Sequence, residues 1–457
     1  MNPAMNERFK AVLIFIAAIL VRWALQERSS MTDCDAEAYI QGARSLAHGL
    51  GYVSAARIPM NHWPAGYSLL LSLWSDPIRA AFIVNLVSHG LATVLLWAVA
   101  RREGWSEGHS LALAAIASFG FFAGLTRPAK PDILTYAFFL AGVLVYRRDT
   151  FAARAGACLL FCALIPVKMI AITFAPGFLL AEMFGMGFKP FLARRWRESL
   201  LAGVFWTAIL GGILWYNAHT LKEATPSSYE AASLETFTRE VMRFITDFFR
   251  CGLATWYGTI RPLPYLVTFA ITAGLGLACL LTLRRSAGGR LVFRAGVAML
   301  ILSFGLECYR TYFAGPRLMG YGMLLTLVGM APRRGSLPLW GAYAAALLCQ
   351  SIYGSRAVTE NGLNCAAYEQ AAVEAAGHLP RDARIFTNGR ALLDVHVGIA
   401  SELGGDLAKV PAGSWYWRLD LPNYDAIMVN VYPPAVLDDA WKLQTRLTDG
   451  AIYQKVR

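Results

Sequence analysis

Residues 78–100 read IRAAFIVNLVSHGLATVLLWAVA, and Arg101 and Arg102 follow them directly. An apolar run of this length can cross a bilayer as one helix, because about 20 such residues span the hydrocarbon core. Pro166 divides a longer apolar stretch, 151–187, into two tightly joined helices. The sequence therefore predicts an α-helical polytopic membrane protein with about eleven transmembrane helices. The remaining ten segments lie at about 10–26, 110–125, 132–146, 151–166, 168–187, 198–216, 263–283, 295–308, 317–332 and 337–354.

The composition agrees with this class of protein. Of the 457 residues, 56% are hydrophobic and 16% are charged, whereas soluble domains are about 45–50% apolar and about 25% charged. This excludes a disordered chain, a small disulfide-stapled protein and an ordinary cytosolic protein. The formal net charge of +12 would indicate nucleic-acid binding in a soluble domain, but in a membrane protein it can record which loops face the cytoplasm.

The positions of the basic residues decide between these two interpretations. If the N-terminus is cytoplasmic, the short basic clusters all fall in loops on the cytoplasmic side, as the positive-inside rule expects. We therefore expect membrane lipids, and no nucleic acid, as partners. The clusters are Arg8 and Lys10; Arg101 and Arg102; Arg147, Arg148 and Arg154; Lys189, Arg194, Arg195 and Arg197; Arg284, Arg285, Arg290 and Arg294; and Arg333 and Arg334.

The same topology places two long loops and the tail outside the cytoplasm. We expect a transmembrane domain over 1–354 with external loops at about 27–77 and 217–262, and a soluble extracytoplasmic α/β domain over 355–457. The first span lacks an obvious small-residue cleavage site, so it is expected to be a retained signal anchor. In the tail we expect strands at 384–387, 424–431 and 452–456, and helices at 366–377, 390–403 and 434–447.

Acidic residues gather in the first external loop and at the second external turn. The first loop begins Asp33-Cys-Asp-Ala-Glu-Ala-Tyr39, and residues 35–47 then follow a helical pattern that suits a helix lying on the bilayer surface. These acids are also compatible with a solvated, acid-rich helix start. Asp132 follows Arg127-Pro-Ala-Lys-Pro at the start of an apolar helix, where an N-cap is the alternative role.

Basic residues on the same face break the positive-inside trend. Lys168 stands in a nearly uncharged stretch, where a lysine costs about 2.5–3.5 kcal/mol at a helix centre unless it finds a partner or snorkels to the interface. Arg310 and Arg317 face outward and need an anionic partner, which protein carboxylates can also supply. Acids can deprotonate a hydroxyl, and bases can hold a departing phosphate. Together they have the layout needed to move a sugar from a lipid phosphate to an acceptor.

These motifs resemble those of the GT-C-fold glycosyltransferases of the protein O-mannosyltransferase and aminoarabinose-transferase type, which are glycosyltransferase family 39-like enzymes. The resemblance covers about residues 10–330, and its most specific part is the first external loop. The matching segments are Asp35 to Tyr39, Gly49-Leu-Gly-Tyr52, Pro64-Ala-Gly-Tyr67, Asp132 after the Arg-Pro turn, Lys168, and the turn from Tyr309 to Arg317.

The resemblance implies an enzyme of the cell envelope, in a bacterial inner membrane, that uses a polyprenyl-phosphate-linked sugar donor. It implies transfer to a hydroxyl of a glycan, lipid or protein acceptor on the outer face, with inversion. Asp35 would then be the general base, and Asp132 would orient the acceptor or hold a cation. The implied substrate-binding residues are Tyr39, His62, Trp63, Arg127, Lys168, Arg310 and Arg317, with the alternatives that Tyr39 and Trp63 pack the loop and that His62 is a satisfied loop histidine.

Two departures from the family pattern concern the phosphate and a metal. Where many members have a Glu-Lys-Pro-Pro-like segment, this chain has Asn61-His-Trp-Pro64, which lacks the lysine. Asp33 and Asp35 also spell an Asp-x-Asp motif whose oxygens suit Mg²⁺ or Mn²⁺. The Asp-x-x-x-Tyr relatives mostly resemble metal-free enzymes, so no cofactor is expected.

Three other functions stay open at this stage. An O-antigen ligase or polymerase would place its basic residues in a large late loop, but the loop at 217–262 has balanced charges. A transporter or flippase would show interrupted helices at the midplane and related halves, and neither pattern is found in the sequence. A non-catalytic scaffold or receptor predicts that Asp35 and Asp132 lie far apart.

Overall fold

The structure is a computed structural model of the whole chain. It falls into two units, of which the first comprises 1–26, 83–126 and 131–357, and the second comprises 27–82, 127–130 and 358–457. The structure describes residues 3–24, 34–53, 60, 64–126, 129–221, 291–309, 315–330, 336–338, 340–341, 345, 385–387, 401–403, 426–429, 441–447 and 450–455.

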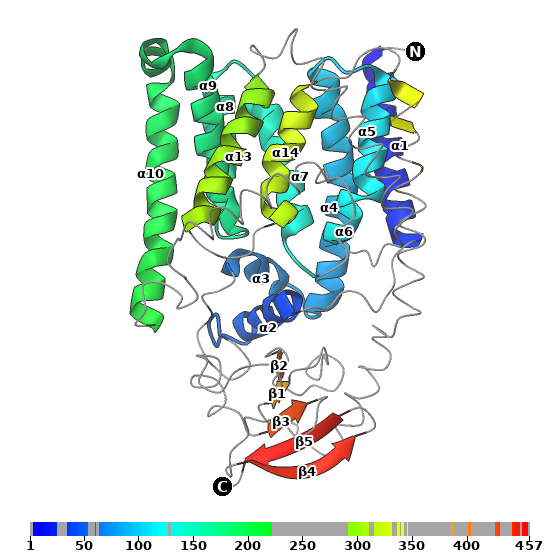
Figure 1. Cartoon of the computed structure of the whole chain (residues 1–457), viewed down its shortest axis with the longest axis vertical. Coiled ribbons are helices and arrows are strands. Elements are labelled where there is room, and N and C mark those ends of the chain that lie inside the picture. Colours follow the sequence, from blue (N-terminus) through cyan, green and yellow to red (C-terminus); the bar gives the residue numbers. More distant parts are fainter. Residues whose placement is uncertain are drawn as a thin grey trace. The chain divides into compact units, whose positions relative to one another are not determined.

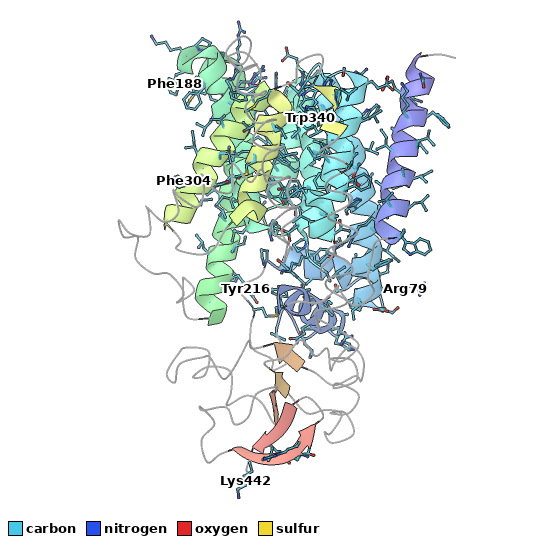
Figure 2. All side chains as sticks on the ribbon, turned by 45° about the vertical axis from the view of Figure 1, so that its right-hand side comes forward. Arg79, Phe188, Tyr216, Phe304, Trp340 and Lys442 are labelled. Carbon is cyan, nitrogen blue, oxygen red and sulfur yellow. The ribbon has the colours of Figure 1, made fainter. Side chains whose placement is uncertain are left out.

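The first unit is a bundle of apolar helices (Figure 1). Among the described residues, Pro77–Arg102, Met169–Met186 and Phe188–Tyr216 are long and apolar enough to cross a membrane by length and composition. Phe188 and Tyr216, at the two ends of the last of these, are labelled in Figure 2. The helices are α1 (Pro3–Ala24), α4 (Pro77–Arg102), α5 (Glu107–Phe119), α6 (Phe121–Thr126), α7 (Asp132–Tyr146), α8 (Phe151–Ala163), η2 (the 3₁₀ helix Met169–Thr173), α9 (Phe174–Met186), α10 (Phe188–Leu221), α13 (Leu291–Tyr309) and α14 (Gly315–Gly329).

Most expected spans coincide with one helix, and two differ. The span expected at 110–125 is two helices, α5 and α6, with Gly120 at the break. The span expected at 168–187 begins with the 3₁₀ helix η2 before α9 continues it. The expected division of 151–187 near Pro166 is confirmed by a turn between α8 and η2. The span expected at 263–283 and most of the span expected at 337–354 lie outside the described residues, so the total of eleven stays a prediction.

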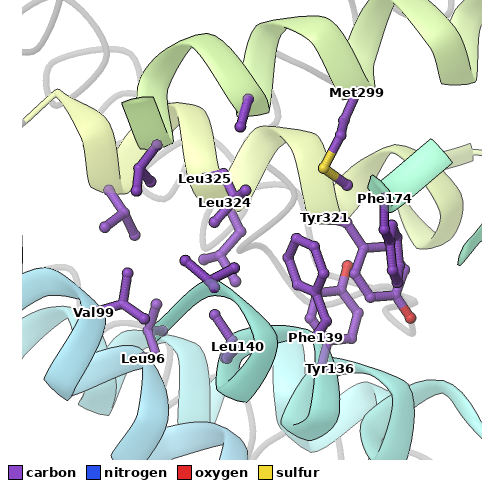
Figure 3. Close-up of a cluster of buried hydrophobic side chains, with 14 of the residues drawn as sticks. Leu96, Val99, Tyr136, Phe139, Leu140, Phe174, Met299, Tyr321, Leu324 and Leu325 are labelled. Atoms are coloured by element: carbon purple, nitrogen blue, oxygen red, sulfur yellow. The ribbon is translucent and has the colours of Figure 1, made fainter. Parts of the chain in front are cut away.

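Glycines let α13 and α14 approach closely. A Cβ atom on Gly296 of α13 would lie 2.4 Å from the backbone nitrogen of Thr326, and one on Gly329 of α14 would lie 2.6 Å from Cα of Phe293. Because lipid is as apolar as the side chains, such close backbone packing is a main source of helix association in membranes. Leu324 and Leu325 of α14 continue from this contact into the buried apolar cluster of the bundle (Figure 3).

A group of paired charges links the loop between α7 and α8 to α8, α9 and α10. Glu182 accepts from Arg195 at 2.6 Å and pairs with Arg154 at 3.3 Å, and its side chain is only 5% exposed. Asp149 of the loop pairs with Arg154 at 2.5 Å and with Arg195 at 3.3 Å. The hydrogen bond from Arg154, and then its charge, hold the pKa of Asp149 below its ordinary value. The Glu182 cluster, Glu182 with Arg154, Arg195 and Asp149, therefore ties one end of three helices together.

In the second unit, the described residues form the helices α2 and α3 and a sheet. Helix α2 (Cys34–Ala47) packs on α3 (Ala65–Leu71) and also contacts β2. The five strands run in the order β2-β1-β3-β5-β4, in which β1 is parallel to both neighbours and β5 is antiparallel to both of its own. The strands are β1 (Ile385–Thr387), β2 (Ser401–Leu403), β3 (Ala426–Val429), β4 (Trp441–Leu447) and β5 (Gly450–Lys455).

Two expectations for the tail are wrong. The helix expected at 434–447 is in part the strand β4, and the end of the helix expected at 390–403 is the strand β2. In β4, the apolar residues Trp441, Leu443 and Leu447 are spaced by even numbers of residues, and this period of two is typical of a strand. The strands expected at 384–387, 424–431 and 452–456 are confirmed by β1, β3 and β5.

Replacing Glu182 by Gln tests the charge cluster. The variant should lower the apparent melting temperature in detergent by several degrees, because removing one partner of a buried charge group costs about 3–5 kcal/mol. The matched control is Glu107→Gln. Glu107 pairs with Lys10 at 2.6 Å, but the two side chains are 43% and 26% exposed. Equal melting temperatures for the two variants would contradict the importance of the cluster.

Candidate functional site

A buried ion pair joins Asp132 and Lys168 in the first unit. Nζ of Lys168 lies 3.0 Å from Oδ1 of Asp132, and the two side chains are 10% and 2% exposed. Both charges were expected on one face of the membrane from sequence, and the structure brings these two together. At this burial the attraction between the charges is much stronger than in water, but each has lost most of its hydration.

Asp132 is placed by the start of α7. Pro131 is the N-cap residue of this helix, so the alternative that Asp132 is the N-cap is wrong. The carbonyl of Pro131 accepts from the backbone N–H of Thr135 at 2.9 Å and from its hydroxyl at 2.8 Å. Asp132 therefore lies in the first turn, where the helix dipole favours a negative charge.

Lys168 is placed by the turn that follows α8. Its N–H donates to the carbonyl of Leu164 at 2.8 Å, and its own carbonyl accepts from Ala171 at 3.0 Å. Pro166, inside this turn, has no N–H with which to continue the helix. Lys168 is extended, with φ −148° and ψ 116°, and precedes η2. Its ammonium ends on Asp132, so the snorkelling alternative does not describe it.

Tyr321 of α14 is a neighbour of this pair that the sequence did not indicate. Its hydroxyl donates to the carbonyl of Asp132 at 3.5 Å, which is longer than a usual O–H···O hydrogen bond and makes this a weak one. The available signal was its position four residues after Arg317, which places both on one face of a helix.

The second unit holds Asp35 and Tyr39 on α2. Asp35 lies in the first turn of this helix. Tyr39 is buried, its ring meets that of Tyr67 edge to face at 5.5 Å, and its carbonyl accepts from the hydroxyl of Ser68 at 2.8 Å. These contacts hold α2 against α3, which is the loop-packing role. That Asp35 and Asp132 belong to one pocket stays a prediction.

Of the other expected site residues, the structure describes only the position of Arg317. Arg317 lies in the first turn of α14. Outside the described residues are Asp33, His62, Trp63, Arg127 and Arg310.

No described residues form a group of three or more His, Cys, Asp or Glu side chains that could hold a metal ion. Asp33 lies outside that part of the chain, and the Asp33–Asp35 metal site stays a prediction.

Two solved structures resemble this chain along nearly its whole length. ArnT from Cupriavidus metallidurans bound to undecaprenyl phosphate matches 97% of this chain and 98% of its own, with a TM-score of 0.59 and 14% identity. The same protein in the apo state matches 100% and 99%, with a TM-score of 0.60 and 12% identity. The expected resemblance to GT-C glycosyltransferases of the aminoarabinose-transferase type is therefore confirmed for the fold. No protein family model and no curated protein sequence matches the chain.

The ion pair makes a prediction about stability. Asp132→Asn or Lys168→Met alone should each be strongly destabilising, because each leaves one buried charge without its partner, at a cost of about 3–5 kcal/mol. The double variant removes both charges and should be more stable than either single variant. Thermal unfolding in detergent of the wild type, the two single variants and the double variant gives the coupling energy between the two side chains. Additive losses would mean that the two side chains do not act as a pair.

Proposed function

We propose that this protein is a membrane glycosyltransferase that moves a sugar from a polyprenyl-phosphate donor to an acceptor hydroxyl on the outer face of the membrane. The observation that carries the proposal is the buried Asp132–Lys168 pair inside a GT-C-like bundle. A fold alone does not establish an activity. Ionisable residues within apolar helices are costly, however, and they usually mark a functional site.

Asp35 is the general base in this proposal. An alcohol is a weak nucleophile until its proton leaves, and a positioned base contributes about 10²–10⁴-fold to the rate. Asp35 takes the proton of the acceptor hydroxyl, whose oxygen attacks the anomeric carbon while the bond to the donor phosphate breaks. A single direct displacement inverts the anomeric centre. Tyr39 then supports Asp35 by packing α2 on α3.

The leaving phosphate is already an anion and needs charge stabilisation more than a proton. Lys168, with Arg310 or Arg317, supplies that charge. An ammonium group has three N–H donors, so a pair with Asp132 is compatible with a phosphate contact. Arg317 lies in the first turn of α14, where the helix dipole also favours an anion. Asp132 holds Lys168 in place at the site.

The lipid part of the donor is supported by the structural neighbour. ArnT was crystallised with undecaprenyl phosphate, and its chain matches this one nearly from end to end. We therefore propose that the donor sugar is carried on a polyprenyl phosphate. We also propose that the protein lies in a bacterial inner membrane, with its N-terminus in the cytoplasm and with its active site and C-terminal domain outside the cytoplasm. His62, Trp63 and Arg127 complete the substrate contacts in this proposal, and the reaction requires no metal.

Replacing Asp35 by Asn tests the base. Membranes carrying the variant should transfer sugar at least about 10²-fold more slowly than wild type, while the protein level and melting temperature stay the same. The assay supplies a panel of polyprenyl-phosphate sugars and follows loss of sugar from the lipid.

The matched control is Asp33→Asn, two residues away. It should keep near-wild-type transfer, and a chelator should have no effect. If Asp35→Asn transfers at the wild-type rate, the base is another residue. If Asp33→Asn and the chelator both abolish transfer, the two acids hold a metal ion.

A further inference from the structure

Tyr321 lies on α14, the helix of one proposed phosphate ligand, and contacts both the helix that begins at Asp132 and the helix that follows Lys168 and η2. It is fully buried, one helical turn after Arg317. These contacts point to a role beyond filling the core.

Its contacts with α7 begin at Asp132 and continue along one face of that helix. The Tyr321 hydroxyl donates to the Asp132 carbonyl at 3.5 Å. The Tyr321 ring stacks on Tyr136 with centroids 3.8 Å apart and an interplanar angle of 6°, and it meets Phe139 edge to face at 5.3 Å. Asp132, Tyr136 and Phe139 are spaced i, i+4 and i+7, so α7 presents all three to Tyr321.

The other contact of Tyr321 is with Phe174, which follows Lys168 and η2 in the chain. The Tyr321 ring lies 4.9 Å from the ring of Phe174, which also lies 4.5 Å from Phe139. Phe174 begins α9 directly after η2, the short helix that Lys168 precedes. Figure 3 shows Tyr136, Phe139, Phe174 and Tyr321 gathered in one cluster. Tyr321 thus contacts the helix that begins at Asp132 and the helix that follows Lys168 and η2.

The two stacked tyrosines differ in their hydroxyl groups. The Tyr136 hydroxyl is buried and has no hydrogen-bond partner among the described residues, whereas the Tyr321 hydroxyl donates to Asp132. A Cβ atom on Gly320 would lie 2.5 Å from the Tyr136 hydroxyl oxygen, so the glycine makes room for this ring. The pair therefore supplies two matched Tyr→Phe changes.

We propose that Tyr321 is a positioning residue that keeps Asp132 and Lys168 aligned with Arg317 during transfer. The proposal rests on the function proposed above, since it assumes that Lys168 and Arg317 hold the leaving phosphate. Tyr321 does not touch the reacting atoms. It acts by holding the start of α7, the segment after Lys168 and the first turns of α14 in one arrangement.

The test compares Tyr321→Phe, Tyr321→Leu, Tyr136→Phe and Phe161→Leu in the transfer assay. We expect Tyr321→Phe to lower kcat about twofold, the low end for one lost hydrogen bond, because the bond is long. Tyr321→Leu should lower it more, with little change in KM for the donor, because alignment and not donor binding is lost. Tyr136→Phe should keep wild-type kcat. Phe161→Leu, in the same buried cluster, should lower the melting temperature and leave kcat of the folded protein unchanged.

A second measurement separates positioning from general packing. If Tyr321 aligns Arg317 with the ion pair, the effects of Tyr321→Leu and Arg317→Met on kcat should be strongly non-additive. Additive effects, or a Tyr321→Leu variant whose kcat equals that of Phe161→Leu, would overturn the positioning role while wild-type transfer still supports the enzyme. A wild-type protein that transfers no sugar from any donor in the panel would overturn the proposed function, and this inference with it.

Discussion

The buried pair between Asp132 and Lys168 is the interaction on which the described bundle depends. Two opposite charges that are almost completely removed from water are tolerated only when they meet at close range and in a good geometry. That requirement constrains both the segment that carries Asp132 and the segment that carries Lys168. Helix α7 has to begin at Asp132, and the chain has to turn after α8 so that Lys168 stands before η2. Neither element can shift without leaving a charge buried alone.

The packing around the ion pair holds the segments that carry its two charges in place. An aromatic group from α7, α9 and α14 fills the space behind it, with Tyr136 and Tyr321 stacked at its centre. Close approach at Gly296 and Gly329 holds α14 against α13, and the Glu182 cluster ties α8, α9 and α10 together. In a bundle of apolar helices, where hydrophobicity does not distinguish one packing from another, such contacts decide which helices are neighbours.

Sequence patterns predicted the helices well because a spanning helix is defined by local composition. The spans at 78–100 and 132–146 match α4 and α7 closely. The errors arose where the pattern was short or mixed. The apolar run around Gly120 fits either one helix or two helices with a break at the glycine. The alternation from Trp441 to Leu447 is a strand pattern, but a helix was expected there. The sequence also predicted Asp132 and Lys168 on one face of the membrane. Tyr321 was missed because an aromatic residue in an apolar helix looks like ordinary core.

The sequence by itself determined the apolar segments of this protein, and it predicted which charges break the positive-inside trend. These follow from local chemistry, since the length of an apolar run and the position of a charge are properties of neighbouring residues. Only the tertiary structure decided that Lys168 pairs with Asp132, and that Tyr321, 189 residues after Asp132 in the chain, lies beside both segments. Such contacts depend on which helix faces join, and that choice is made by packing, because apolar faces by themselves do not distinguish one neighbour from another.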